Sequence, residues 1–199
     1  MMSMMHAMFS KELIEHINLR YGMKLKKSSL IYGSIKPDAS TIFAKYPHYF
    51  DKSLDMLCER IALLKDVASS KENIETRAFA RELGVATHYI ADYFCRVHND
   101  INGIKHNEHL GHVIYEQKLY KKTKMQYLDE IREEAINRID SELIIIKNTS
   151  IKEYIIANHR KYMREAGKLF LYNNVKKRYM IDTKYAMKMI LIVTSYIVE

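Results

Sequence analysis

Residues that make turns are scarce in this chain, which has only 2 prolines and 6 glycines among its 199 residues. An all-β fold of many short strands needs frequent turns, and glycine and proline supply many of the backbone conformations that turns require. Lysine, glutamate, leucine, isoleucine and methionine, which favour helices, are instead common. The sequence therefore predicts an all-α fold.

The length limits how that fold can be organised. A chain of 199 residues can bury one sizeable core and is short for two independent domains. Apolar residues make up 48% of the chain and charged residues 28%, an ordinary globular balance without signs of disorder. We expect a single domain over residues 1–199, a bundle of roughly seven to nine helices of ordinary length.

Several helix ends can be predicted from local patterns. Apolar spacing between residues 9 and 17 indicates a first helix that ends before Gly22. His16 lies among polar neighbours and is expected on the surface. A helix opening near residues 72–76 should run to about Cys95, with Gly84 inside it for a packing reason. Ser150 is a plausible cap for a helix over residues 151–170.

Both prolines precede a residue that could bind a metal. Pro37 stands before Asp38, and Pro47 stands before His48. Because proline fixes its own φ and disfavours helix at the preceding residue, we expect a shaped loop here, able to hold ligands rigidly. Two ordinary helix-breaking prolines would explain the pattern as well. Asp51 or Ser53 is expected to cap the helix that follows.

Two pairs of histidine and carboxylate have helical spacing. His88 and Asp92 are four residues apart, and so are His112 and Glu116. Residues four apart lie on one helix face, so each pair can bind one cation without bending the backbone. Imidazole and carboxylate ligands without a nearby thiolate suit catalytic zinc. The pairs predict a site for several metal ions in a cleft between helices.

The ordered set of these residues resembles the bacterial zinc-dependent phospholipase C family. The matching motifs are His-Ala-Met at the first helix, Gly-x-x-x-Pro-Asp from Gly33, and the two helical pairs. Two further histidines match as well: His48 is ten residues after Asp38, and His98 is ten residues after His88. The eight metal ligands that the resemblance implies, all within residues 6–116, are His6, Asp38, His48, His88, Asp92, His98, His112 and Glu116.

The resemblance also implies how these ligands divide among zinc ions. The first ion would be held by Asp38, His48, His88 and Asp92. Asp92 would bridge to a second ion that His6 also binds. The third would be held by His98, His112 and Glu116. In the family, an N-terminal tryptophan completes the His6 site; this chain has no tryptophan, so two to three ions are expected.

Such a site predicts hydrolysis of phosphodiesters. Closely spaced zinc ions can supply a deprotonated water and positive charge for the phosphate. The resemblance implies that Asp38 binds metal and orients or deprotonates the attacking water. Tyr46, Tyr49 and Phe50 flank His48 and could line a pocket for a choline head group through cation–π contacts. Ordinary packing explains these three residues equally well.

Three functions remain open at the level of sequence. The first is a zinc phosphodiesterase resembling phospholipase C, which cleaves a phospholipid to diacylglycerol and a phosphorylated head group. The second is a related zinc-dependent single-strand nuclease. The third is a non-catalytic binding module stabilised by metal. No protein partner is evident.

The charge suits a phosphate-bearing partner. The formal net charge is +8, which fits a lipid head group or a nucleic acid, and a generally basic surface explains it as well. Residues 160–189 mix basic residues with Tyr162, Tyr172, Tyr179 and Tyr185. This stretch suits peripheral contact with a membrane surface or simply a solvated helix face. C-terminal helices are expected over residues 125–199.

The remaining features favour a cytoplasmic protein. Cys58 and Cys95 form no C-x-x-C motif and are expected to be buried free thiols. The first residues lack the basic and apolar regions of a signal peptide. The longest apolar run, near Met189 to Val193, is too short to span a membrane.

Overall fold

The computed structural model describes residues 3–43, 46–70, 74–99, 109–126, 128–171 and 175–199. Regular structure within these ranges is entirely helical, which confirms the all-α prediction. The helices described are α1 (Ser3–Tyr21), α2 (Lys27–Ala39), α3 (Phe50–Ser69), α4 (Arg77–Tyr93), α5 (His109–Gln126), α6 (Leu128–Ile136), α7 (Ile139–Asn148), α8 (Ile151–Leu171) and α9 (Val175–Val198). Two short 3-10 helices are η1 (Thr41–Phe43) and η2 (Arg96–His98).

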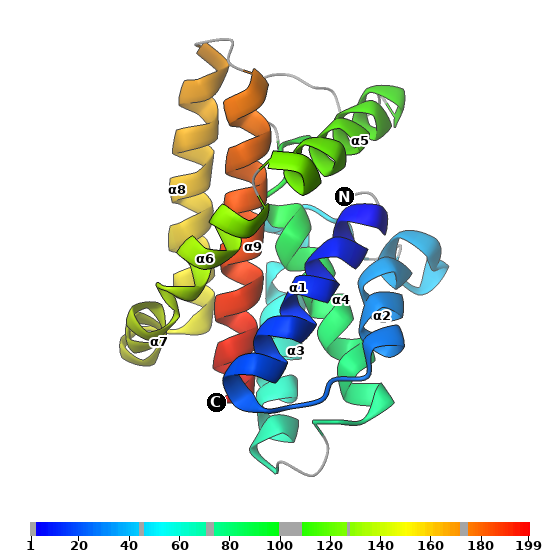
Figure 1. Ribbon diagram of the computed structural model, residues 1–199, viewed down its shortest axis with the longest axis vertical. Coiled ribbons are helices and arrows are strands. Elements are labelled where there is room, and N and C mark those ends of the chain that lie inside the picture. The colour runs from blue at the N-terminus through cyan, green and yellow to red at the C-terminus, as the bar shows by residue number, and fades with distance from the viewer. Residues whose placement is uncertain (1–2, 44–45, 71–73, 100–108, 127, 172–174) are drawn as a thin grey trace.

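Two helices form the centre of the molecule. α9 packs against α1, α3 and α4 and against each helix from α5 to α8, whereas α4 packs against α1, α2, α3 and α9. Figure 1 shows α9 beside α8, with α1 to α4 on its other side. Every residue of α4 from Leu83 to Tyr93 is buried, including His88 and Asp92. Because buried polar groups need partners, the neighbouring helices must supply them.

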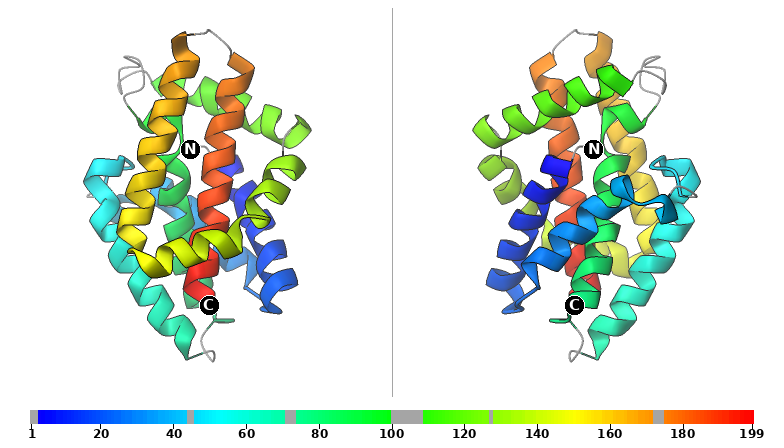
Figure 2. Two further views of the ribbon diagram at one scale, coloured as in Figure 1. Left: turned by 90° about the vertical axis from the view of Figure 1, so that its left-hand side faces the viewer. Right: turned by 90° about the vertical axis from the view of Figure 1, so that its right-hand side faces the viewer.

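Two glycines allow α2 to lie directly on α4. A Cβ atom at Gly33 would lie 2.0 Å from the carbonyl oxygen of Arg81, and one at Gly84 would lie 2.3 Å from that of Leu30. Neither distance leaves room for a side chain, so the two backbones are in contact where the helices cross (Figure 2, right). This contact is the packing reason expected for Gly84. It places the last turn of α2 beside the middle of α4.

The loop predicted before Asp38 is wrong, because residues 31–38 belong to α2. Pro37 lacks an amide hydrogen and removes one helical hydrogen bond. However, Leu30, Gly33 and Pro37 lie on one helix face, and all three are buried. The burial of this face against α4 keeps the last turn helical despite the proline.

The second proline does lie in irregular backbone, as predicted for residues 46–49. The capping prediction for α3 is wrong, because the residue before the helix is Tyr49 and its side chain makes no capping hydrogen bond. The Ser53 hydroxyl lies within the helix, where it donates to the Tyr49 carbonyl oxygen at 3.0 Å. It also forms a buried hydrogen bond of 2.9 Å with the Tyr93 hydroxyl. The Ser53 hydroxyl therefore bonds to Tyr49 and Tyr93 and does not cap the helix.

Three other helix ends follow the sequence pattern. α1 ends at Tyr21, and Gly22 adopts the left-handed φ of 67° that favours glycine at this position. Thr76 caps α4 by accepting a hydrogen bond from the Phe79 amide. Ser150 caps α8 in the same way, accepting from the Glu153 amide at 3.1 Å.

His16 is not on the surface as predicted. Its side chain is buried and lies 3.2 Å from the Ser195 hydroxyl of α9. α1 packs against α9 along this face, so the polar neighbours of His16 in the sequence do not determine its exposure. The two cysteines are free, with Cys95 buried and Cys58 half-buried.

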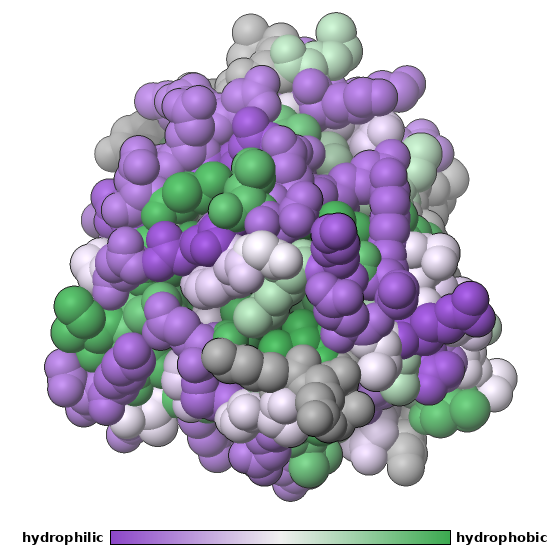
Figure 3. Space-filling model, turned by 60° about the horizontal axis from the view of Figure 1, so that its bottom comes forward, coloured by the Kyte–Doolittle hydropathy of each residue, from purple (hydrophilic) through white to green (hydrophobic). Residues whose placement is uncertain are grey.

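Packing accounts for three of the four tyrosines in the basic stretch near the C-terminus. Tyr162, Tyr179 and Tyr185 are buried in the core, whereas Tyr172 lies outside the described residues. On the face in Figure 3, apolar side chains form small patches separated by hydrophilic ones. Among the described residues, no helix combines the length and apolarity needed to cross a bilayer.

Candidate metal centre

Seven of the eight predicted ligands have described side chains, and the fold brings them together from six segments. His112 lies in α5, but its side chain is outside the described residues. The seven are His6 from α1, Asp38 from α2, His48 from the segment before α3, His88 and Asp92 from α4, His98 from η2 and Glu116 from α5.

Asp38, His48, His88 and Asp92 form the tightest group. One ligand atom from each lies within 4.8 Å of the others. His48 Nδ1 is 3.4 Å from Asp38 Oδ1 and 3.0 Å from Asp92 Oδ2. His88 Nε2 is 3.6 Å from the same Asp38 oxygen and 3.1 Å from the same Asp92 oxygen. The two imidazole nitrogens are 3.3 Å apart.

These distances match the geometry of a tetrahedral zinc site. Ligand atoms about 2.0–2.1 Å from a tetrahedral zinc ion lie roughly 3.3 Å from one another. The five measured separations, from 3.0 to 3.6 Å, are distributed around that value. Two imidazoles and two carboxylates are also a donor set that zinc accepts. The residues therefore fit one zinc ion.

His88 is held so that a lone pair faces the group. Its Nδ1 is 2.8 Å from the Ser34 carbonyl oxygen, so this nitrogen carries a hydrogen and donates it. In the neutral ring, Nε2 then presents a lone pair to the oxygens of Asp38 and Asp92. Electron pairs facing one another repel unless a cation lies between them. A second ring nitrogen bonded to a main-chain carbonyl is also the usual support of a zinc-binding histidine.

The other oxygen of Asp92 faces a second set of residues. Asp92 Oδ1 is 3.5 Å from His6 Nε2 and 3.5 Å from His98 Nε2. His6 Nε2 is buried without a hydrogen-bond partner among the described residues, as expected for an atom that binds a metal. Asp92 is fully buried between the two sets. One carboxylate thus has an oxygen directed to each half of the cluster, which is the geometry of a bridging ligand.

The third predicted set lies next to the second. His98 Nε2 is 3.7 Å from Glu116 Oε1, so these two side chains can share an ion. The structure also brings His98 close to Asp92, a contact that the separate assignment of three zinc sites did not anticipate. His98 is therefore placed between the second and third sets.

Burial and charge set the ionisation of the cluster. Burial lowers the pKa of His6 well below its usual range, and the neighbouring His88 lowers it further. Burial acts to raise the pKa of Asp92, but the surrounding histidines, His98 first, outweigh it and hold the pKa well below its usual range. Asp92 is therefore a carboxylate, the form in which it can bind metal.

A comparison with known protein families agrees with this geometry. A family model described as zinc dependent phospholipase C matches residues 5–169, most of the 199-residue chain. The chain belongs to the zinc-dependent phospholipase C family. No match was found among curated proteins or among solved structures. All eight predicted ligands lie within the matched residues, and the family description itself states zinc dependence.

The aromatic residues around His48 are partly engaged in packing in this member of the zinc-dependent phospholipase C family. The Phe50 ring stacks on His159 with centroids 3.7 Å apart and planes at 2°, so one of its faces is covered. The main-chain oxygen of Tyr46 accepts a hydrogen bond from the Tyr89 hydroxyl at 3.0 Å. Tyr46, Tyr49 and Phe50 are all half-buried, which leaves the head-group pocket as a proposal.

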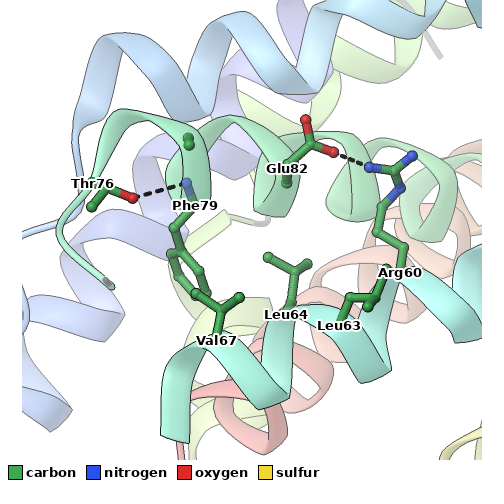
Figure 4. Close-up of a pocket in the computed structure, with 8 residues that line it drawn as sticks. Arg60, Leu63, Leu64, Val67, Thr76, Phe79 and Glu82 are labelled. Carbon is green, nitrogen blue, oxygen red and sulfur yellow. Dashed lines mark hydrogen bonds and ion pairs between the residues drawn. The ribbon is translucent and has the colours of Figure 1, made fainter. Parts of the chain in front are cut away.

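An apolar groove elsewhere shows by contrast what identifies the metal centre. The groove lies between α3 and α4, with Leu64, Val67 and Phe79 along it and an ion pair between Arg60 and Glu82 at one end (Figure 4). Its volume is about 310 Å³. The described residues that line it include no imidazole or thiol, and the one carboxylate among them is paired. The candidate site is therefore identified by its ligand chemistry rather than by its concavity.

One supporting feature was missed from the sequence. Ser34 contributes only its main-chain carbonyl to His88, and a main-chain contact leaves no residue-type signature. The one available signal was Gly33, since a glycine within a helical apolar stripe can mark a close helix crossing.

Proposed function

We propose that the protein is a zinc-dependent phosphodiesterase that hydrolyses a phospholipid to diacylglycerol and a phosphorylated head group. The observation that carries the proposal is the position of Asp92, whose two oxygens face two different groups of potential ligands. A carboxylate shared in this way fits two adjacent divalent ions, which suit an in-line displacement at phosphorus. Membership of the zinc-dependent phospholipase C family supports the same class of reaction.

The metal ligands would be those that the geometry groups together. Asp38, His48, His88 and Asp92 would hold one ion, and Asp92 with His6 would contribute to a second. His98 and Glu116, with His112, would hold a third. When bound, zinc supplies positive charge for the phosphoryl oxygens and lowers the pKa of water to near neutrality.

Asp38 is the residue proposed to handle the proton of the attacking water. Its side chain is 31% exposed, whereas that of Asp92 is fully buried, so Asp38 lies on the side of the cluster that solvent reaches. Burial raises the pKa of Asp38, and the negative charge of Asp92 raises it further against the opposing effect of His88 and His48.

The reaction is tested by comparing two substrates with one preparation of zinc-loaded protein. We expect release of phosphorylcholine from phosphatidylcholine vesicles and no cleavage of single-stranded DNA or RNA. The net charge of +8 also suits nucleic acid, so cleavage of single strands alone would replace the lipid proposal with a nuclease. Protein that binds fewer than two zinc ions and hydrolyses neither substrate after zinc addition would instead be a metal-stabilised binding module.

The role of Asp38 is tested with Asp38→Asn. The amide can still contact a cation through its oxygen but cannot accept a proton from water. We expect turnover to fall on the order of 100-fold, with a smaller loss of zinc measured by elemental analysis. Equal losses of turnover and zinc would make Asp38 a metal ligand only.

A further inference from the structure

A second aspartate, Asp182 of α9, is as deeply buried as Asp92 and belongs to no predicted metal site. Its carboxylate is surrounded by hydrogen-bond donors. Asp182 Oδ2 accepts from the Arg96 main-chain amide at 3.0 Å and from the Tyr115 hydroxyl at 2.7 Å. Asp182 Oδ1 accepts from the Tyr162 hydroxyl at 3.0 Å. The carboxylate therefore links η2, α5 and α8 to α9.

Two of these donors lie within two residues of predicted zinc ligands in the sequence. Arg96 lies two residues before His98 within the same short 3-10 helix, and Tyr115 immediately precedes Glu116 in α5. The third donor, Tyr162 of α8, has no such neighbour. The same oxygen of Asp182 thus binds both segments that supply His98 and Glu116, whose ligand atoms are 3.7 Å apart.

The main-chain bond to Arg96 restrains backbone rather than a side chain. η2 has only three residues, and a helix this short has few hydrogen bonds of its own to fix its position. A buried charged acceptor makes stronger hydrogen bonds than a neutral one. Asp182 is consequently suited to fix the position of η2 relative to α5.

We propose that Asp182 is a positioning residue that sets the distance between the zinc ligands His98 and Glu116. The inference rests on the proposed function, because it assumes that these two residues bind zinc. Asp182 lies beyond residue 169, where the family match ends, so the match itself assigns it no role. The carboxylate acts through the two segments and does not contact the metal.

A matched pair of substitutions tests the inference. Tyr115→Phe and Tyr162→Phe each remove one buried hydroxyl that donates to Asp182, but only Tyr115 lies on a segment that supplies a ligand. We expect Tyr115→Phe to weaken the zinc ion that His98 and Glu116 would hold by about 10-fold, within the usual range for groups that orient metal ligands. Tyr162→Phe should change that affinity by less than about 3-fold. Zinc affinity is measured by competition with a chromophoric chelator.

The measurements separate the two proposals from each other. The urea midpoint of the metal-free variants should fall by similar amounts, so that unequal zinc affinity cannot be attributed to unequal stability. Asp182→Leu should weaken zinc binding more than Tyr115→Phe does. Equal zinc affinities in the two tyrosine variants would overturn the positioning role and leave the metal site intact. Wild-type protein that binds no zinc would overturn the proposed function itself.

Discussion

Asp92 and Asp182 are both fully buried, yet their surroundings are opposite. Asp182 accepts three hydrogen bonds, from one amide and two hydroxyls. Asp92 lies among imidazole nitrogens instead, with His88 Nε2 3.1 Å and His48 Nδ1 3.0 Å from its Oδ2. A carboxylate among donors is satisfied by the protein alone. The imidazole nitrogens around Asp92 are instead potential metal ligands, as is its own carboxylate.

The ionisation of the two groups reflects this difference. Burial acts to raise the pKa of both aspartates. At Asp182 burial prevails over the charge of Arg96 and the tyrosine hydrogen bonds, so the pKa is raised. At Asp92 the charges of the histidines prevail, so the pKa is lowered. Burial alone therefore does not identify a metal-binding aspartate, whereas the kind of atom around it does.

The largest effect is expected from Asp92→Asn. The amide nitrogen replaces one carboxylate oxygen, so one half of the cluster loses its shared ligand and the negative charge is lost. We expect zinc content to fall in both halves and phosphodiesterase activity to drop on the order of 1,000-fold, several kcal/mol of transition-state stabilisation. Elemental analysis and the vesicle assay measure these quantities. A variant that keeps its full zinc content would show that Asp92 does not bridge.

Removal of metal should be the next largest effect. Zinc held by ligands from six separate segments would require the folded chain, so zinc at 1,000 times its Kd would stabilise the fold by about 4 kcal/mol. We expect an excess of chelator to lower the urea midpoint of the wild type. The same chelator should leave the midpoint of Asp92→Asn nearly unchanged, which serves as the control. An equal shift in both proteins would place the stabilising metal elsewhere.

Substitution at the helix crossing should disturb the surroundings of Asp92 and leave those of Asp182 in place. In Gly33→Ala the new Cβ would meet the Arg81 carbonyl and push α2 away from α4. We expect a loss of roughly 1–3 kcal/mol in the free energy of unfolding and weaker zinc binding. Gly167→Ala in α8 is the matched control, because its Cβ would meet no atom within 4 Å. Urea unfolding that shows equal stability for the two variants would contradict the close crossing.

The smallest effect concerns His16, which shares α1 with His6 but has no role at the metal centre. Burial, with a contribution from Arg20, lowers the pKa of His16 to about 4 from an ordinary value of 6.5. Between these values the unfolded chain binds a proton that the folded protein does not, so stability falls as the pH falls from about 6.5 to 4. We expect a contribution of roughly 1–2 kcal/mol after allowance for partial solvent screening.

The variant His16→Gln should remove this part of the pH dependence. Urea unfolding of both proteins in the presence of chelator, from pH 7 to pH 4, measures the difference. Parallel curves for wild type and variant would show that His16 titrates normally in the folded protein.

The helical fold and much of the candidate site could be predicted because their determinants are local. Helical spacing placed His88 above Asp92, and Gly22 marked the end of α1. The loop predicted before Asp38 was wrong because the preference of Pro37 is local, whereas the burial that keeps this turn helical comes from α4. The prediction that His16 lies on the surface was wrong for the same reason, because α9 covers its side chain.

Other features could not be predicted because they involve main-chain atoms or distant segments. The Ser34 carbonyl orients His88, but any residue at that position has a carbonyl. Asp182 is close to Arg96 and Tyr115 only after α9 has packed against η2 and α5. Such contacts are long-range in sequence and carry no characteristic spacing.

The close crossing of α2 and α4 at Gly33 and Gly84 affects how the spacing between Asp38 and His88 responds to substitutions nearby. Side chains that interlock can shift between rotamers when a neighbour is replaced, and the elements they separate then move. Main-chain atoms in direct contact have no rotamers and no such adjustment. The spacing between Asp38 and His88 is thus inherited from the polypeptide backbone itself, so it should persist through substitutions of the surrounding side chains as long as both glycines remain.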